Sequence, residues 1–277
     1  MLDLPSAATA TARSLAPAVD NAFAILGLLA GRPRGAGVSD IARELGLSKS
    51  SCFNILSTLL RQGAVEKRGD SAAWHLGPKL VELGTAARRG YSGRAALRTL
   101  LQTLVDREQL VCLVGQVLGG HAGIVVLDRV LPRGHALDSV NVPIGEVYPL
   151  TAPAMGRAVL AAYDDEEVLV LAQAQSQTQS HSRSPSGYTA KALQTELLAA
   201  LKTVRSKGYA LSLEEYEPGV RAVAAVLPGY QVDPSLVLCL VGRAAGLGAP
   251  RLAKLGGMLR ETATQAAALI EREGEWA

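Results

Sequence analysis

The fold of the N-terminal part is decided by the stretch from Val38 to Leu60, which reads VSDIARELGLSKSSCFNILSTLL. Gly46 stands where a helix C-terminus favours a positive φ, and Ser48 is a good N-cap for a following helix. The pattern therefore predicts two helices separated by a tight turn. The apolar residues of the second helix share one face at 3.6-residue spacing, and they are Cys52, Ile55, Leu56 and Leu59.

The opposite face of the second helix is small, polar or hydrogen-bonding near the helix N-terminus. It consists of Lys49, Ser50, Phe53, Asn54 and Ser57. A helix needs such a surface to enter a DNA major groove, so we interpret the stretch as a helix-turn-helix. On this stretch alone, an ordinary αα-hairpin with a solvated polar face is the alternative.

The residues after the second helix favour DNA binding. Two short strands, 64–68 and 73–76, flank a turn at 69–71 and form a predicted hairpin. With a first helix at 18–30, the order of three helices and a hairpin predicts a winged helix. Lys67 and Arg68 lie near the wing, where their charges suit contact with phosphate or the minor groove.

Length and charge agree with two domains. The chain has 277 residues, and no apolar run approaches the roughly 20 residues that span a bilayer. Residues 1–90 carry 11 Lys/Arg and 7 Asp/Glu, a net charge of +4, which leaves −1 for residues 91–277. The basic surplus therefore accompanies the helix-turn-helix, as phosphate contact requires.

Residues 1–17 are expected to be a disordered arm, because they are rich in Ala, Ser and Pro and lack the pattern of a signal peptide. The three cysteines, Cys52, Cys112 and Cys239, are widely spaced in apolar runs. This usage fits a reducing cytoplasm. The expected organisation is then a winged helix-turn-helix domain at 18–77, a linker helix at 78–92 and a second domain at 93–277.

The second domain is predicted to mix helices and strands around one sheet. A Gln/Ser-rich stretch at 173–186 is expected to be a surface loop. The predicted helices are 94–108, 154–162, 166–174, 190–207 and 251–271, and the predicted strands are 110–117, 122–130, 208–213, 221–227 and 236–241.

Several short motifs occur in a characteristic order. The N-terminal part holds VSDIA at 38–42, GLSKSS at 46–51, LSTL at 56–59 and LG at 76–77. The second domain holds PLTA at 149–152, GYA at 208–210, EE at 214–215 and GV at 219–220. Together they resemble the IclR family of bacterial transcriptional regulators across nearly the whole chain.

The resemblance implies an α+β protein with a winged-helix N-terminal domain, a linker helix that dimerises and a GAF-like C-terminal domain that binds a small effector. It also implies a homodimer or homotetramer on a palindromic operator of double-stranded DNA, with no membrane attachment. The residues expected to contact DNA are Ser39, Ser48, Lys49, Ser50, Ser51, Phe53, Asn54, Ser57, Lys67 and Arg68.

Two positions depart from the family's pattern, because Asn54 and Asn21 stand where the family usually has Arg. Asn can read adenine through two hydrogen bonds, whereas Arg favours guanine or phosphate. We therefore expect an unusual operator or docking. Phe53 is expected to pack on a thymine methyl group, with helix–helix packing inside the small domain as the alternative.

The family's ligand-contacting positions suggest an apolar effector pocket. Most of the side chains there cannot donate a hydrogen bond, and Ser212, Cys239 and the backbone amides near 154–156 are the polar groups that remain. We expect an apolar or aromatic ligand, such as an aromatic acid, rather than a small 2-oxo acid. A pocket that has lost its ligand and serves only assembly is the alternative. The expected pocket residues are Val140, Tyr148, Ala154, Met155, Gly156, Ser212, Val220, Ala222, Cys239 and Val241.

No pattern for catalysis, metal or cofactor is found. The four histidines are scattered without zinc-site spacing, and no phosphate-binding or nucleophile motif is present. Glu214 and Glu215 are expected in a solvated turn, and Cys239 as a redox sensor has only Arg243 nearby in sequence to activate it. The chain is not expected to be an enzyme. The rival hypothesis is a small-molecule sensor or metabolic enzyme with an N-terminal interaction module.

Overall fold

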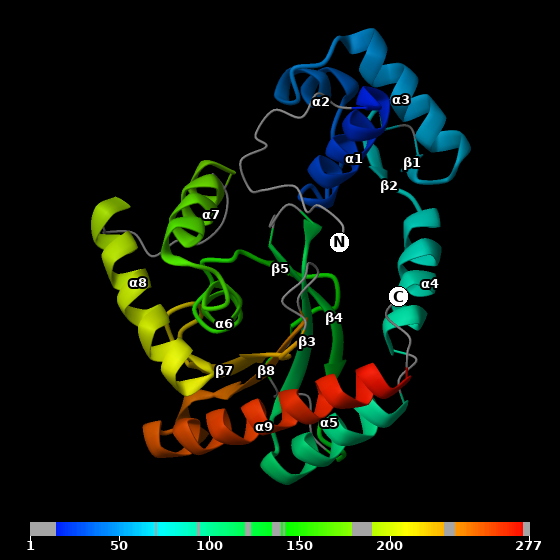
Figure 1. The fold of residues 1–277 in the computed structure, drawn as a ribbon. Helices are drawn as coiled ribbons and strands as arrows, with labels where there is room; N and C mark the ends of the chain where they lie inside the picture. The colour runs from blue at the N-terminus through cyan, green and yellow to red at the C-terminus, as the bar shows by residue number, and fades with distance from the viewer. Residues whose placement is uncertain are drawn as a thin grey trace. The chain divides into compact units, whose positions relative to one another are not determined.

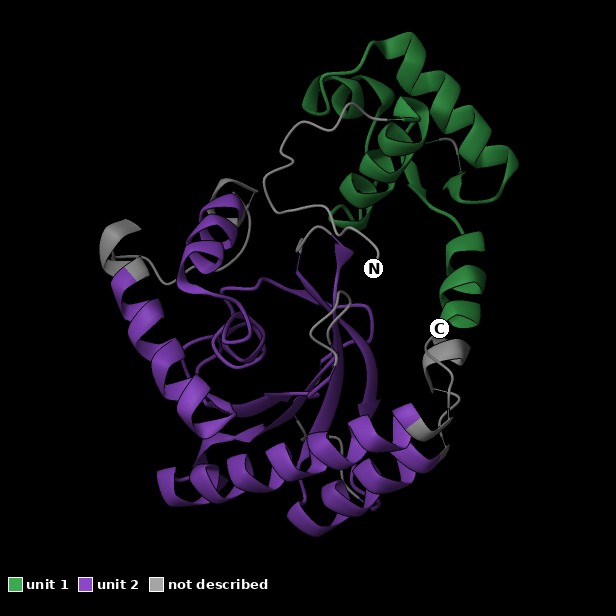
Figure 2. Cartoon of the chain, in the orientation of Figure 1, with its two compact units in different colours: residues 1–90 green, residues 91–277 purple. Residues whose placement is uncertain are grey.

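The computed structural model describes residues 15–69, 71–92, 95–119, 123–134, 140, 142–178, 190–229 and 236–273. The contacts divide the chain into two compact units, residues 1–90 and 91–277 (Figure 2). Residues 1–14 of the expected arm, residues 179–186 of the expected loop and three of the four histidines lie outside the described residues.

The N-terminal unit is a helix-turn-helix followed by a two-stranded antiparallel wing (Figure 1). A bridge between Ala36 and Trp74 joins the segment before the second helix to the wing. The elements are α1 (Pro17–Ala30), α2 (Val38–Glu44), α3 (Lys49–Arg61), β1 (Val65–Lys67), β2 (Trp74–Leu76) and α4 (Lys79–Ser92).

The turn between α2 and α3 follows from its residues. Gly46 has a φ of +65°, a conformation that side chains disfavour, and the amide of Leu47 donates to the carbonyl of Ala42 at 2.8 Å. The hydroxyl of Ser48 accepts a hydrogen bond from the amide of Ser51 at 3.1 Å and caps α3. The helix-turn-helix prediction is confirmed.

A small core holds this unit together. Ile25 of α1, Ile41 of α2 and Leu56 of α3 are each fully buried, and Trp74 of β2 closes the cluster at 3% exposure. Burial of each aliphatic side chain contributes about 1.5–3 kcal/mol relative to an exposed one. The core therefore fixes α3 on one side and leaves its other side to solvent.

The C-terminal unit is a six-stranded antiparallel sheet in the order β5-β4-β3-β8-β7-β6, with helices on both faces (Figure 1). Its helices are α5 (Ala95–Glu108), α6 (Met155–Leu160), α7 (Asp165–Thr178), α8 (Ala190–Lys207), a 3₁₀ turn η2 (Ala244–Gly246) and α9 (Ala249–Glu273). Its strands are β3 (Val111–Val117), β4 (Ile124–Val130), β5 (Val147–Tyr148), β6 (Ala210–Leu213), β7 (Val220–Val226) and β8 (Leu236–Arg243).

Alternation along the central strands assigns residues to the two faces of the sheet. On β8, Leu238 and Leu240 pack with α5 and α9, whereas Cys239 and Val241 face the side of α6, α7 and α8. All of these strand residues are buried, as expected for strands covered on both faces. The α+β fold class is confirmed.

One expectation about local structure was wrong, and one strand had not been predicted. Helix α7 continues to Thr178 through the first part of the Gln/Ser-rich stretch, because Gln and Ala favour the helix despite the low complexity. The short strand β5 was not expected, since only its pairing with Ile124 and Val125 of β4 defines it. Within the described part of the chain, no helix is long and apolar enough to cross a membrane.

Candidate DNA interface and ligand pocket

The solvent side of α3 presents the side chains expected to contact DNA. Lys49, Ser50 and Asn54 are exposed, and Ser57 is half-buried. Phe53 is 51% exposed, so about half of its side chain is available for contact with DNA. An exposed Lys, Asn and aromatic side chain in the first turns of a helix match the chemistry by which a recognition helix reads a major groove.

Three serines form a hydrogen-bonded cluster at the N-terminus of α3. The hydroxyl of Ser48 donates to the hydroxyl of Ser51 at 2.8 Å and lies 3.1 Å from that of Ser50. Because Ser48 also caps the helix, its oxygen is committed to holding the turn. The free amides beside this cluster suit a DNA phosphate.

The basic residues of the wing already have partners within the unit. Arg68 donates to the Glu66 carboxylate at 2.7 Å, and the Lys67 ammonium lies 4.6 Å from the centre of the Trp74 ring. Both side chains are exposed, so both contacts can open towards phosphate at little cost. Ser39, in the first turn of α2, is also exposed.

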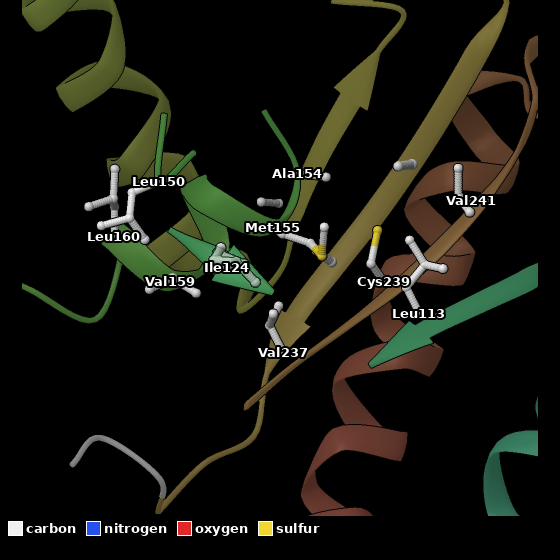
Figure 3. Close-up of a cluster of buried hydrophobic side chains, with 14 of the residues drawn as sticks. Leu113, Ile124, Leu150, Ala154, Met155, Val159, Leu160, Val237, Cys239 and Val241 are labelled. Carbon is white, nitrogen blue, oxygen red and sulfur yellow. The ribbon is translucent and has the colours of Figure 1, made fainter. Parts of the chain in front are cut away.

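The floor of a pocket in the C-terminal unit is built from two rows of residues that run across the sheet. One row pairs Ser212 with Ala222 and Ala222 with Val241. The other pairs Cys239 with Leu113 on β3. Small and aliphatic side chains in these rows leave an apolar floor, as Figure 3 shows around Cys239 and Val241.

The walls complete a cavity of about 60 Å³. Nine of the ten expected residues line it, all except Gly156. Sequence patterns missed six lining residues: Leu113 could have been found from strand alternation, whereas the others lie in irregular segments. These six are Leu113, Val142, Ala152, Pro153, Tyr216 and Glu217.

Gly156 has a packing role instead. A Cβ built on it would lie 2.0 Å from the carbonyl oxygen of Leu150, so only glycine allows α6 to approach this segment. That approach brings Met155 onto the sheet (Figure 3). Its sulfur lies 3.3 Å from the position that a Cβ on Gly115 would take. Gly156 thus shapes the pocket without lining it.

Polar groups are few in this pocket, and they sit at its edge. Ser212 is 5% exposed, and its hydroxyl has no hydrogen-bond partner among the described residues. The Tyr148 and Tyr216 rings lie 5.2 Å apart at an angle of 48°. Burial, followed by the electrostatic influence of Tyr216, raises the pKa of Tyr148, which therefore keeps its proton and can donate a hydrogen bond.

Glu214 and Glu215 lie in the expected turn, but both carboxylates have partners there. The Glu214 carboxylate accepts from Arg221 at 2.8 Å and from the amide of Gly219 at 3.1 Å, and Glu215 pairs with Arg157 at 3.0 Å. Their side chains are only about one-third exposed. These pairs hold the loop that carries Tyr216 over the pocket.

The cysteines are inert by environment. Burial raises the pKa of the Cys239 thiol and raises that of Cys112 to about 12. Neither thiol forms an appreciable thiolate at neutral pH, which argues against redox sensing at Cys239. Among the described residues, no group of three or more His, Cys, Asp or Glu side chains is arranged to hold a metal ion.

Comparison with known families identifies both units. The model of the IclR helix-turn-helix domain matches residues 18–69, and that of the bacterial transcriptional regulator IclR C-terminal domain matches residues 94–268. The glycerol operon regulatory protein of Streptomyces coelicolor is 32% identical over 213 residues, which covers 75% of this chain and 77% of that protein. Such relatives are regulators of transcription and not enzymes.

Solved structures share the fold. An IclR transcriptional regulator from Alicyclobacillus acidocaldarius matches with a TM-score of 0.71 and 26% identity, over 91% of this chain and 98% of that one. An IclR homologue from Microbacterium hydrocarbonoxydans, crystallised with 4-hydroxybenzoate, matches with a TM-score of 0.64 and 19% identity, over 92% and 99% of the two chains. This chain belongs to the IclR family of bacterial transcriptional regulators, with a DNA-binding helix-turn-helix domain and a C-terminal effector-binding domain.

Proposed function

We propose that the protein acts in the cytoplasm as a homodimer or homotetramer on a palindromic operator, with α3 of two subunits in successive major grooves. In this proposal Asn54, Phe53 and Ser57 read bases, and Lys49, Lys67 and Arg68 contact phosphates. The remaining contacts, made to the sugar–phosphate backbone of the DNA, come from Ser39, Ser50 and Ser51. The observation that carries the proposal is the exposed polar face of a capped α3.

The boundaries of the functional parts are proposed to be 18–77 for the winged helix, 78–92 for a linker helix and 93–277 for the effector domain, after an arm at 1–17. Helix α4 supports a role in dimerisation, because Val81 and Leu83 are 71% and 52% exposed within one chain. Large apolar side chains at such exposure favour burial against a second subunit. In this proposal, DNA binding and effector binding both change the arrangement of the linker helices in the assembly.

The effector is proposed to have an apolar or aromatic body and to be an organic acid. The aliphatic floor and the two tyrosines support the body, and the buried hydroxyl of Ser212 supports one polar contact. The homologue crystallised with 4-hydroxybenzoate is consistent with this class of ligand. Effector binding would change operator affinity by a coupling free energy of about 1–3 kcal/mol.

Selection of genomic fragments by the purified full-length protein tests the proposal. We expect enrichment of a palindromic sequence. We also expect the amount of DNA retained by the protein to fall steeply between about 50 and 200 mM salt. Retention that is independent of sequence would contradict operator recognition. That outcome would favour the rival hypothesis of a sensor or enzyme with an N-terminal interaction module.

Calorimetric titration of the full chain tests the effector. 4-Hydroxybenzoate and pyruvate represent the aromatic and the small 2-oxo acids, and we expect only the former to bind. Tight pyruvate binding would overturn the ligand class. A protein that binds its operator but neither acid would favour the alternative that the pocket serves assembly alone.

A further inference from the structure

A second cavity lies at the end of β8, where the chain turns into η2 and α9. It has a volume of about 190 Å³ and opens to solvent. Its floor is apolar, formed by Leu110, Val241 and Leu247, all buried. Arg243 and Arg251 are also among its lining residues. Neither arginine is among the residues that were expected to line the effector pocket.

The lining is fixed by contacts within the unit. The Arg251 guanidinium donates to the carbonyl of Glu108 at 2.8 Å and to that of Gly246 at 2.7 Å, so it ties the end of α5 to η2. Gly242 keeps the floor compact, because a Cβ there would lie 2.5 Å from Leu110. The cavity therefore exists before any ligand enters, which lowers the entropic cost of binding.

The charge of the lining favours an anion. Arg251 donates to neutral carbonyls, so its positive charge is not neutralised by them. Arg243 is exposed and has no ion pair or hydrogen bond with a side chain of the described residues. Within the described lining there are two arginines and no carboxylate. Guanidinium groups bind carboxylates through paired hydrogen bonds.

This cavity adjoins the effector pocket. Val140 and Val241 line both. Arg221 provides a second connection, because one of its nitrogens donates to the carbonyl of Leu247 at 2.9 Å and another to Glu214 at 2.8 Å. Leu247 belongs to the second cavity, and Glu214 begins the loop over the effector pocket. A ligand in either cavity thus contacts residues that also form the wall of the other cavity.

We propose that the cavity at Arg243 and Arg251 is a second ligand site of the C-terminal unit, for a small organic carboxylate with an apolar body. The carboxylate pairs with Arg243, and the body lies on Leu110, Val241 and Leu247. Occupancy of this site changes affinity in the effector pocket through the shared valines and Arg221. The site is separate from the proposed effector position, so either can fail without the other.

The test is titration of the full-length protein with benzoate and with its neutral counterpart benzyl alcohol, followed by calorimetry and saturation-transfer NMR. We expect benzoate to bind, and Arg243→Gln to weaken it roughly tenfold, as loss of a charged hydrogen bond implies. Lys254→Gln is the matched control, since Lys254 is an exposed cation on α9. It should leave benzoate affinity unchanged, and benzyl alcohol should not respond to either variant.

A third variant, Ala222→Leu, distinguishes the two cavities, because Ala222 lies on the floor of the effector pocket only. Benzoate binding that survives Ala222→Leu and is weakened in Arg243→Gln supports the second site. Binding that is lost in Ala222→Leu and survives Arg243→Gln overturns it, while leaving the proposed effector pocket intact. Absence of benzoate binding to the wild-type protein also overturns it, whatever the outcome of the operator selection.

Discussion

The recognition face of α3 and the effector pocket solve two binding problems in opposite ways. On α3, polar side chains such as Asn54 and Lys49 stand in solvent on the outside of a small core. In the pocket, Ser212 is a buried polar residue in a mostly apolar floor. DNA offers hydrogen-bonding edges and charge, so an exposed polar face suits it, whereas a small ligand gains most from apolar burial.

The two units also differ in how much core supports each site. Among the described residues, nine buried residues form the core of the N-terminal unit, and the C-terminal sheet is flanked by clusters of 24 and 22. A small core leaves little free energy of unfolding to spare, because whole domains are stable by only about 5–15 kcal/mol. Removal of one core side chain should therefore affect DNA binding more readily than ligand binding.

The largest effect is expected for Leu56→Ala in the core of the N-terminal unit. Leu56 is fully buried, and its truncation should reduce the free energy of unfolding of this unit by about 3 kcal/mol. Urea unfolding followed by fluorescence of the buried Trp74 measures it. The control Leu60→Ala, at a position that is 43% exposed, should cost less than about 1 kcal/mol. Equal midpoints for the two variants would contradict the assigned core.

Gly156→Ala tests the corresponding packing in the C-terminal unit. Its methyl group would meet the Leu150 carbonyl, so we expect a loss of about 2 kcal/mol in stability and weaker effector binding. Differential scanning calorimetry and ligand titration measure both. Gly84→Ala in α4, where nothing lies within 4 Å, should instead raise helix stability by up to about 1 kcal/mol. An unaltered melting profile for Gly156→Ala would refute the close approach of α6.

Asn54→Ala tests base reading on the exposed face. We expect loss of about 1–3 kcal/mol of discrimination at one base position, with the rest of the operator profile kept. Selection from randomised operators, compared between wild type and variant, measures this. A profile that is unchanged at every position would remove Asn54 from the base-reading set.

The smallest effects are expected from single phosphate contacts. Lys49→Ala and Arg68→Ala should each weaken binding to all sequences alike and reduce the salt slope by about 0.9. Glu66→Gln should strengthen binding slightly, because it frees Arg68 from its ion pair. Lys202→Ala on α8 is the control, since it removes an exposed charge from the other unit. A slope reduced equally by Lys202→Ala would show a general charge effect.

Much of the N-terminal unit could be predicted from the sequence, because its signals are local. Gly46 and Ser48 act through their own backbone and side chain, so the turn and cap follow from residue type. The same holds for the pocket floor, where Cys239 and Val241 are two residues apart on one strand. Alternation alone places them on the same face.

The rest of the candidate site depends on contacts that sequence does not encode locally. Tyr216 reaches the pocket from an irregular loop held by the Arg221–Glu214 and Arg157–Glu215 pairs, and β5 exists only through its pairing with β4. Gly156 was expected in the lining because of its backbone amide near the start of a predicted helix. Its backbone contact with Leu150 depends on how α6 meets a distant segment.

In the proposed binding mode, the serine cluster at the start of α3 limits how much DNA sequence one subunit can read. Ser48 is occupied in capping the helix, and its hydroxyl is shared with Ser50 and Ser51. Under the proposed roles, base discrimination then rests mainly on Phe53, Asn54 and Ser57, and so few side chains distinguish only a short DNA sequence. A short sequence recurs often by chance in a genome. In the proposed dimer or tetramer, the same short sequence is read twice at a fixed spacing, so assembly of the subunits would contribute to specificity.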